Sequence, residues 1–347
     1  MARTLTVATP PRVAGNAGHP PPRWPYMSLT RRQFLAAAAG VGGAALTGGV
    51  LADQVWPLLS REDLVPGRTP ELVLPSRAWT TTPDRLTFAA VGDTGTGGRQ
   101  AVAVATRMAQ GYEQNPYGLI THLGDICYYG KIENRFDDVF LRPYGPLIEA
   151  GVDVELAIGN HDGEVYFSDA RLEEIETELR LLGTPARYYR TTHGPVDFFY
   201  LDSSTPGLFG DDASRQLDWL DDALSTSTSQ WKIVCLHHPP YSSGRHGPTP
   251  GAEDMLVPVL ERHAVDLVLT GHDHNYERTI PLDGITYVVS GGGAKLTPVR
   301  PTRITAAAAS VLQYLHVEVD GDRLTARCIR PDGGLVDRFT LRAREGR

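Results

Sequence analysis

The sequence predicts an α/β fold built on buried strands. Short runs rich in β-branched and aromatic residues alternate with longer segments whose apolar residues recur at helical spacing. Several apolar runs end abruptly in Asp, Asn or His, and such runs are typical of strands buried on both faces. Strands that alternate with helices predict an α/β sheet with polar groups gathered at the carboxyl ends of its strands. With 41% hydrophobic and 21% charged residues, the 347-residue chain has an ordinary globular composition.

The expected elements follow one another from Arg85 onwards. Strands are expected in LTFAAVGD, LITHLGD, VELAIGNHD, IVCLHHP and DLVLTGHDH. Helices are expected over residues 100–110, 170–182 and 253–263, and from Ser214, a plausible N-cap, through SRQLDWLDDAL. Antiparallel strands are expected over residues 287–290, 314–319, 324–329 and 336–341, with Asp320-Gly321 as a hairpin turn.

Charge and cysteine content exclude several classes of protein. The net charge is −8 and no long basic run occurs, so we expect no nucleic-acid binding. The odd number of cysteines, Cys127, Cys235 and Cys328, excludes a fully paired disulfide framework, and the lack of C-x-x-C spacing excludes a thiolate zinc site. Cys127 and Cys235 lie in apolar runs and are predicted to be buried thiols.

Residues 30–51 read TRRQFLAAAAGVGGAALTGGVL and look like a twin-arginine export signal. Arg31 and Arg32 precede an apolar stretch, and Val50 and Ala52 predict cleavage after Ala52. The alternative is a transmembrane anchor, against which the glycines in the stretch argue; a retained signal or a lipid anchor also stays open. We therefore expect export by the twin-arginine machinery to a periplasmic, cell-surface or extracellular location, with membrane contact only through this segment.

The chain divides into three expected parts. Residues 1–52 form an N-terminal extension and signal peptide, residues 53–84 a proline-containing linker, and residues 85–345 one catalytic domain. Met27 directly precedes SLTRRQFL, so our hypothesis is that translation starts there and that residues 1–26 are an upstream extension.

The polar strand ends together form an ordered set of five blocks. They are Gly92-Asp93-Thr94-Gly95, Gly124-Asp125-Ile126-Cys127-Tyr128, Gly159-Asn160-His161-Asp162, His237-His238-Pro239 and Gly271-His272-Asp273-His274. Oxygen and imidazole donors without thiolate suit iron, manganese or zinc. Two such ions about 3.5–4 Å apart can clamp the attacking and leaving oxygens of a displacement at phosphorus. One carboxylate must then bridge the ions, since unbridged cations so close would repel each other.

This set resembles the five signature blocks of the purple acid phosphatases, within the calcineurin-like metallophosphoesterases. The resemblance runs from Arg85 to Leu341 and includes YERT, YVVSGGG and DGGLVDRFTL. It implies a short, single-domain type with a four-layer α/β/β/α sandwich of two mixed β-sheets. It also implies hydrolysis of small phosphorylated substrates, chiefly monoesters, by a metal-bound hydroxide at a dinuclear centre.

The resemblance also implies the role of each donor. Asp125 would bridge the two ions. The remaining ligands would be Asp93, Tyr128 and His274 at the first site, and Asn160, His237 and His272 at the second. A Tyr128 phenolate favours Fe(III), which leaves Fe, Zn or Mn as the divalent partner; the alternative for Tyr128 is a core tyrosine beside Tyr129.

Two histidines would act on the substrate. His161 would contact phosphate and protonate the leaving oxygen, while His246 would face the substrate unless it is a plain surface residue. His238 has no counterpart role and is predicted to be structural. Two other functions stay open: a phosphodiesterase of the same superfamily that uses Mn or Zn, and a catalytically inactive binding protein on the same scaffold.

Overall fold

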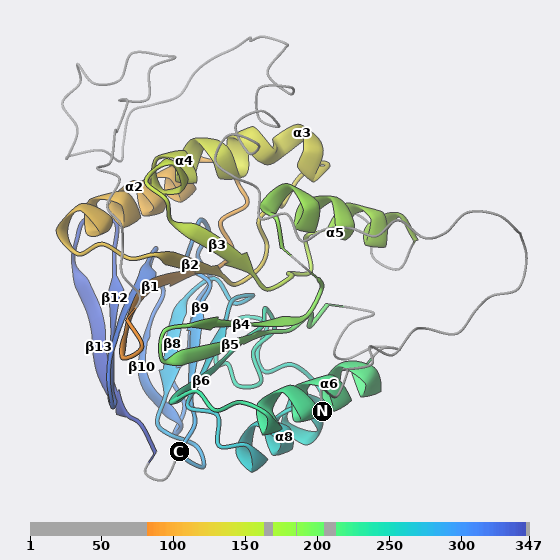
Figure 1. Cartoon of the computed structure of the whole chain (residues 1–347). Coiled ribbons are helices and arrows are strands. Elements are labelled where there is room, and N and C mark those ends of the chain that lie inside the picture. Colours follow the sequence, from red (N-terminus) through yellow and green to blue (C-terminus); the bar gives the residue numbers. More distant parts are fainter. Residues whose placement is uncertain (1–81, 163–168, 185, 205–212, 345–347) are drawn as a thin grey trace, which may run out of the picture.

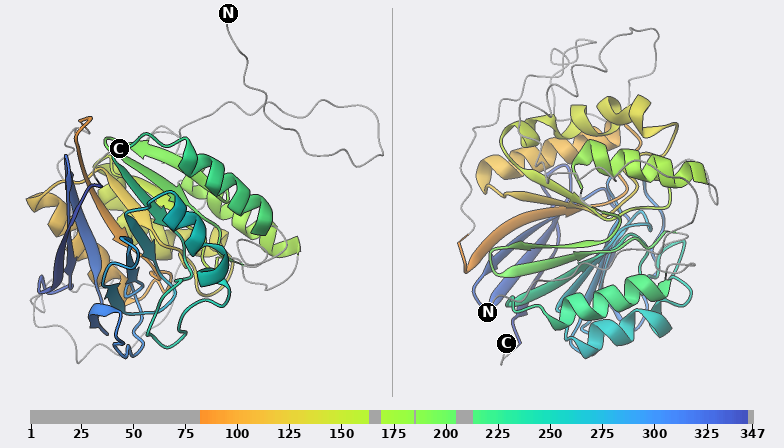
Figure 2. Two further views of the ribbon diagram at one scale, coloured as in Figure 1. Left: turned by 90° about the horizontal axis from the view of Figure 1, so that it is seen from below. Right: turned by 45° about the vertical axis from the view of Figure 1, so that its right-hand side comes forward.

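A computed structural model of the chain describes residues 82–162, 169–184, 186–204 and 213–344. The predicted export signal, its cleavage site, the hypothetical start at Met27 and most of the linker lie outside these residues. The described chain forms four layers, in which two β-sheets face each other and helices cover both outer faces (Figures 1 and 2). The predicted four-layer sandwich of two mixed sheets is therefore confirmed.

The first sheet has six strands in the order β13-β12-β11-β1-β2-β3. Their bounds are β1 Arg85–Val91, β2 Leu119–His122, β3 Asp153–Leu156, β11 Tyr314–Asp320, β12 Arg323–Ile329 and β13 Leu335–Arg342. β1, β2 and β3 run parallel, whereas β11, β12 and β13 pair antiparallel with their neighbours. The expected hairpin turn between β11 and β12 is present, and Gly321 has a φ of +54° that suits such a turn.

The second sheet has seven strands in the order β10-β8-β9-β7-β6-β5-β4. Their bounds are β4 Tyr189–His193, β5 Val196–Tyr200, β6 Trp231–Cys235, β7 Leu267–Thr270, β8 Tyr276–Thr279, β9 Thr286–Ser290 and β10 Thr305–Ala309. The prediction of an antiparallel strand over 287–290 is wrong in part, because β9 joins this sheet and runs parallel to β7. β9 pairs antiparallel only with β8.

Helices cover the outer face of each sheet (Figure 1). Over the first sheet lie α2 (Arg99–Gln114), α3 (Ile132–Phe136), a π-helical turn (Asp137–Leu141), α4 (Arg142–Glu149) and α5 (Asp169–Leu182). Over the second lie α6 (Ala213–Ser225), α7 (Ala252–Met255) and α8 (Val257–Arg262). The helix expected over 253–263 is thus two short helices, because Pro258 has no N–H to continue the hydrogen-bond ladder. Ser214 lies inside the first turn of α6, so it is not the N-cap.

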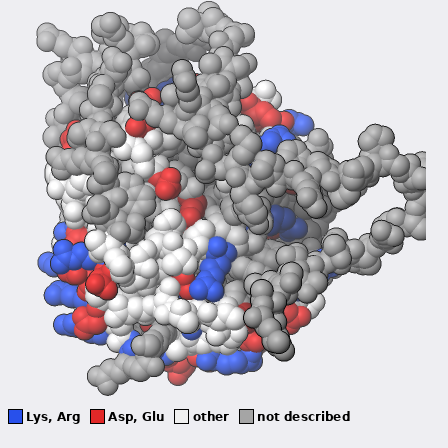
Figure 3. Space-filling model, in the orientation of Figure 1, with Lys and Arg blue, Asp and Glu red and all other residues white. Residues whose placement is uncertain are grey.

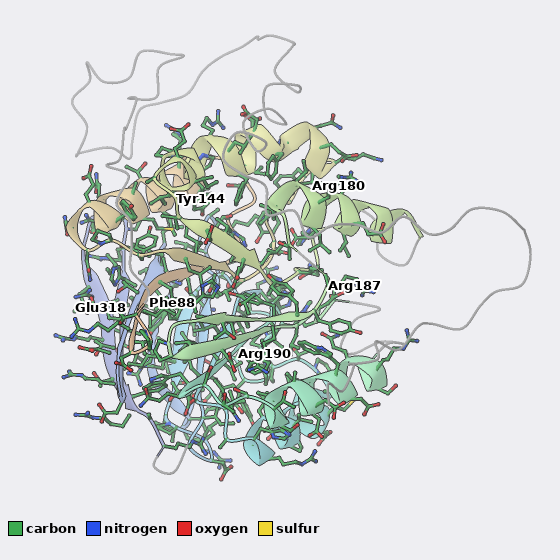
Figure 4. The ribbon with its side chains drawn as sticks, viewed as in Figure 1. Phe88, Tyr144, Arg180, Arg187, Arg190 and Glu318 are labelled. Carbon is green, nitrogen blue, oxygen red and sulfur yellow. The ribbon has the colours of Figure 1, made fainter. Side chains whose placement is uncertain are left out.

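One of the hydrophobic cores lies between the two sheets. Phe88 on β1 packs edge-to-face against Phe198 on β5, with ring centroids 5.1 Å apart, and Figure 4 shows Phe88 between the layers. Cys127, Cys235 and Cys328 are buried and form no disulfide, as expected for the buried thiols Cys127 and Cys235. On the face in Figure 3, basic and acidic side chains alternate along the edge where β12 and β13 lie; Arg85 pairs with Asp320 and Arg342 with Asp322.

Candidate metal centre

The predicted donor residues gather at one edge of both sheets. In the first sheet Asp93, Asp125 and Asn160 follow β1, β2 and β3, and in the second His237 and His272 follow β6 and β7. These strands run parallel within each sheet, so their carboxyl ends lie side by side. The centre therefore lies where the carboxyl edges of the two sheets meet.

Three donor residues have a backbone conformation that side-chain-bearing residues rarely adopt. The φ angles of Asp93, Asp125 and His272 are +61°, +57° and +69°. Such left-handed backbone costs of order 1–3 kcal/mol at each residue and is found at functional sites. The tight turn after each strand thus places a donor side chain where regular strand geometry would not.

The first donor group consists of Asp93, Tyr128 and His274. The Tyr128 hydroxyl lies 3.0 Å from Asp93 Oδ1 and 3.0 Å from His274 Nε2. His274 Nε2 lies 3.4 Å from the same Asp93 oxygen. Tyr128 is therefore buried, as a core tyrosine would be, and its hydroxyl also contacts two other predicted donors.

The second donor group consists of Asn160, His237 and His272. Asn160 Oδ1 lies 3.0 Å from His237 Nε2 and 2.9 Å from His272 Nδ1. Asp125 lies between the two groups. Its Oδ1 is 3.5 Å from His237 Nε2 of the second group. Its carboxylate also clusters with the Asp93 carboxylate and the His274 imidazole of the first group. Asp125 thus lies beside donors of both groups.

The spacing of these atoms fits metal ions. Ions of this size bind nitrogen and oxygen ligands at about 2.0–2.2 Å, which sets neighbouring ligand atoms roughly 3.0–3.5 Å apart. The contacts within the two groups span 2.9–3.4 Å, and Asp125 adds one of 3.5 Å. The chain's own donors therefore match two adjacent cation sites in number, chemistry and spacing.

Electrostatics in the centre also point to a cation. Burial, together with Asp93 and Asp125, raises the pKa of Tyr128 well above its usual value. Burial lowers the pKa of His237, but Asp125 and Asp93 outweigh it and raise that pKa to about 10. A bound metal ion would supply this positive charge and favour the phenolate form of Tyr128.

The two histidines predicted to act on the substrate, His161 and His246, border the two donor groups. The ring of His161 is exposed and its centroid lies 4.9 Å from that of Tyr128, while its backbone N–H donates to Asp125 Oδ1 at 2.8 Å. His246 is also exposed, with its ring 4.5 Å from His272, so it borders the second group. His238 lies 4.4 Å from the ring of His272, and its Nδ1 is 3.0 Å from the Ser203 hydroxyl.

Two buried carboxylates hold the loops of the centre, and the sequence analysis assigned neither a role. Asp162 accepts backbone hydrogen bonds from the Asp125 and Ile126 loop at 2.8 and 2.7 Å, and from Gly159 at 2.8 Å. Asp273 accepts the backbone N–H of His246 at 2.9 Å. Asp162 lies two residues after Asn160, and Asp273 lies between His272 and His274, and this proximity is the local signal of their roles.

The chain is similar to phosphoesterases and acid phosphatases of known sequence. The sequence model of one family, described as calcineurin-like phosphoesterase, matches residues 86–276. Human tartrate-resistant acid phosphatase type 5 is 30% identical over 259 residues, covering 65% of this chain and 78% of that protein. Purple acid phosphatase 3 of Arabidopsis thaliana is 30% identical over 237 residues, covering 60% of this chain and 63% of that protein.

Solved structures share the fold. A purple acid phosphatase from yellow lupin seeds has a TM-score of 0.65 at 20% identity, covering 77% of this chain and 55% of its own. GAP50, the anchor in the inner membrane complex of Plasmodium, has a TM-score of 0.63 at 16% identity, covering 76% of this chain and 90% of its own. At these identities the structural matches establish the architecture alone.

Proposed function

As a member of the calcineurin-like phosphoesterase family, the chain is a metal-dependent hydrolase of phosphoric esters, and we propose that it is a purple acid phosphatase acting on monoesters. The contact of the Tyr128 hydroxyl with Asp93 and His274, at 3.0 Å each, carries this proposal. A phenolate is a hard, anionic ligand and favours a trivalent ion. The proposal therefore includes Fe(III) at the first site and divalent Fe, Zn or Mn at the second.

The residues around a bound phosphate would have different roles. Asp125 would bridge the ions, and the two donor groups would hold one ion each. When bound, the ions would activate the attacking water and neutralise charge that develops on the phosphoryl group. The exposed imidazole of His161 would donate a proton to the leaving oxygen. Asp273 accepts the backbone N–H of His246, which holds its loop beside the second donor group, and the His246 imidazole would face the phosphate.

The activity assay must separate three functions. The metal-loaded protein is offered a nitrophenyl monoester and a nitrophenyl diester, and its metals are quantified. Faster monoester hydrolysis by an iron-containing protein supports the proposal. Preference for the diester with manganese or zinc would favour the phosphodiesterase. Turnover of neither substrate by a fully loaded protein would favour a catalytically inactive binding protein.

We further propose export by the twin-arginine pathway, on the basis of Arg31, Arg32 and the apolar stretch that follows them. Within the described residues, no helix combines the length and apolarity needed to cross a membrane. Replacing Arg31 and Arg32 by Lys should block export, and a chain beginning at Met27 should still be exported. Cytoplasmic retention of the chain that begins at Met27, with export of the full chain, would refute the start-site hypothesis.

A further inference from the structure

Lys295 lies in the loop after β9, and backbone contacts hold this loop against the metal centre. Gly293 donates its N–H to the Gly92 carbonyl at 3.1 Å, and Thr297 donates to the His274 carbonyl at 2.8 Å. A Cβ on Gly293 would collide with that Gly92 oxygen, so only glycine permits this close approach. The backbone of Lys295 is thus held on both sides by segments that carry metal donors.

The Lys295 ammonium lies over the face of the Tyr128 ring. Its Nζ is 3.0 Å from the centroid of that ring and 5.3 Å from the centroid of Tyr129. The His161 ring borders Tyr128 as well, at 4.9 Å between centroids. In the part of the chain that the structure describes, no carboxylate forms an ion pair with Lys295. This half-buried cation therefore lies beside the predicted metal donors, and no carboxylate among the described residues pairs with it.

Holding the Lys295 ammonium beside the metal-loaded centre costs free energy unless an anion occupies the centre. Asp93, Asp125 and the Tyr128 phenolate carry fewer negative charges than a trivalent and a divalent ion carry positive ones. The loaded centre thus keeps a net positive charge, and an ammonium beside it is repelled. Attraction to the ring face offsets only part of this repulsion. A phosphate dianion between the metals and Lys295 removes the repulsion and gives the ammonium a hydrogen-bond acceptor.

We propose that Lys295 is a substrate-binding residue whose ammonium donates a hydrogen bond to a non-bridging phosphoryl oxygen and so favours dianionic monoesters over monoanionic diesters. This inference rests on the proposed phosphatase function. An added cation attracts a dianion about twice as strongly as a monoanion at the same distance, and phosphate monoesters are mostly dianions at pH 7. Lys295 would thus supply part of the monoester preference.

The test uses the metal-loaded full chain and Lys295→Met, which removes the charge but keeps an apolar stem. Isothermal titration at pH 7 gives the Kd of inorganic phosphate, and assays give kcat/KM for the nitrophenyl monoester and diester. We expect phosphate binding and monoester kcat/KM to weaken about 10- to 100-fold, as for loss of one charge-assisted hydrogen bond. The diester kcat/KM should fall severalfold less. Lys295→Arg should restore much of the phosphate affinity, and Lys131→Met, an exposed lysine before α3, is the matched control.

Three results would overturn the role of Lys295 in substrate binding. Unchanged phosphate affinity in Lys295→Met, or equal losses for monoester and diester, would overturn it. Loss of metal from Lys295→Met would also overturn it, since Lys295 would then support the centre and not the substrate. A wild-type protein that binds no metals or hydrolyses no monoester would instead refute the proposed function, so the two failures are distinguishable.

Discussion

Replacing Asp162 by Asn tests whether the centre depends on a carboxylate that binds no metal in this account. Asp162 Oδ2 accepts the backbone N–H groups of Asp125 and Gly159, both at 2.8 Å, and Oδ1 accepts those of Ile126 and Cys127 at 2.7 and 3.3 Å. Asn keeps one acceptor oxygen, so two of these bonds are lost and an amide group faces two N–H donors.

The magnitude follows from these bonds. Burial and the charge of Asp125 raise the pKa of Asp162 to about 7, so its carboxyl is only partly ionised near neutral pH. Ordinary hydrogen bonds contribute about 0.5–1.5 kcal/mol each, so the loss of two should lower the free energy of unfolding by about 1–3 kcal/mol. This is a large share of the roughly 5–15 kcal/mol that stabilises a typical domain. Because the bonds join the loops of Asp125 and Gly159, the variant should also lose metal affinity.

Urea unfolding of the metal-free proteins measures the first effect, and metal analysis after dialysis measures the second. Asp332→Asn is the matched control, since Asp332 accepts a backbone N–H from Gly334 in an exposed turn. A loss below about 1 kcal/mol in Asp162→Asn, with both metals retained, would refute the assignment of Asp162 as the organiser of the loops.

Three further predictions follow from the same geometry. Asp125→Asn should deplete both metals and His272→Ala mainly one; loss of the same single metal in both variants would exclude Asp125 as the bridge. His161→Ala should keep its metals and lose about 10²–10⁴-fold in kcat on esters with poor leaving groups; a uniform loss across leaving groups would indicate phosphate positioning instead. Burial lowers the pKa of His193, but its 2.9 Å hydrogen bond to Glu155 and the charge of that residue raise it above the usual value. The contact between protonated His193 and Glu155 stabilises the fold below the pKa of His193 in the unfolded chain, and this stabilisation is lost as the pH rises through its pKa in the folded protein. In urea unfolding, His193→Gln should therefore lower the free energy of unfolding more at pH 5 than at pH 8. Equal losses at the two pH values would refute this prediction.

The strands at the centre could be predicted from the sequence, and the outer strands of the second sheet could not. β1, β2, β6 and β7 are apolar runs that end at a polar donor, so composition and position agree. β4 reads YRTTH and β10 reads TAAAA, and alanine favours helices. Both lie at the ends of the second sheet, where pairing with one neighbour determines the strand and local composition does not.

The donor residues were predictable for the same reason, whereas their supporting residues were not. Each donor lies within a few residues of a strand end or in a recognisable block. Asp162 and Asp273 lie in two of the same blocks, but their roles depend on hydrogen-bond partners elsewhere in the chain. Asp162, Asp273 and Lys295 act through segments far from them in the sequence: Asp162 bonds to the loop of Asp125, Asp273 to that of His246, and Lys295 covers Tyr128. Only the packed fold brings these partners together.

The visible absorption spectrum of the purified, metal-loaded protein tests the central claim most directly. A phenolate bound to Fe(III) transfers charge to the metal under visible light, so the protein should be violet or pink. Tyr128→Phe removes the hydroxyl that contacts Asp93 and His274 and should abolish the band. Tyr129→Phe should retain it, because the neighbouring ring is 60% exposed and has no such contact among the described residues. A colourless, active protein that contains manganese or zinc but no iron, or a band that survives Tyr128→Phe, would contradict the account.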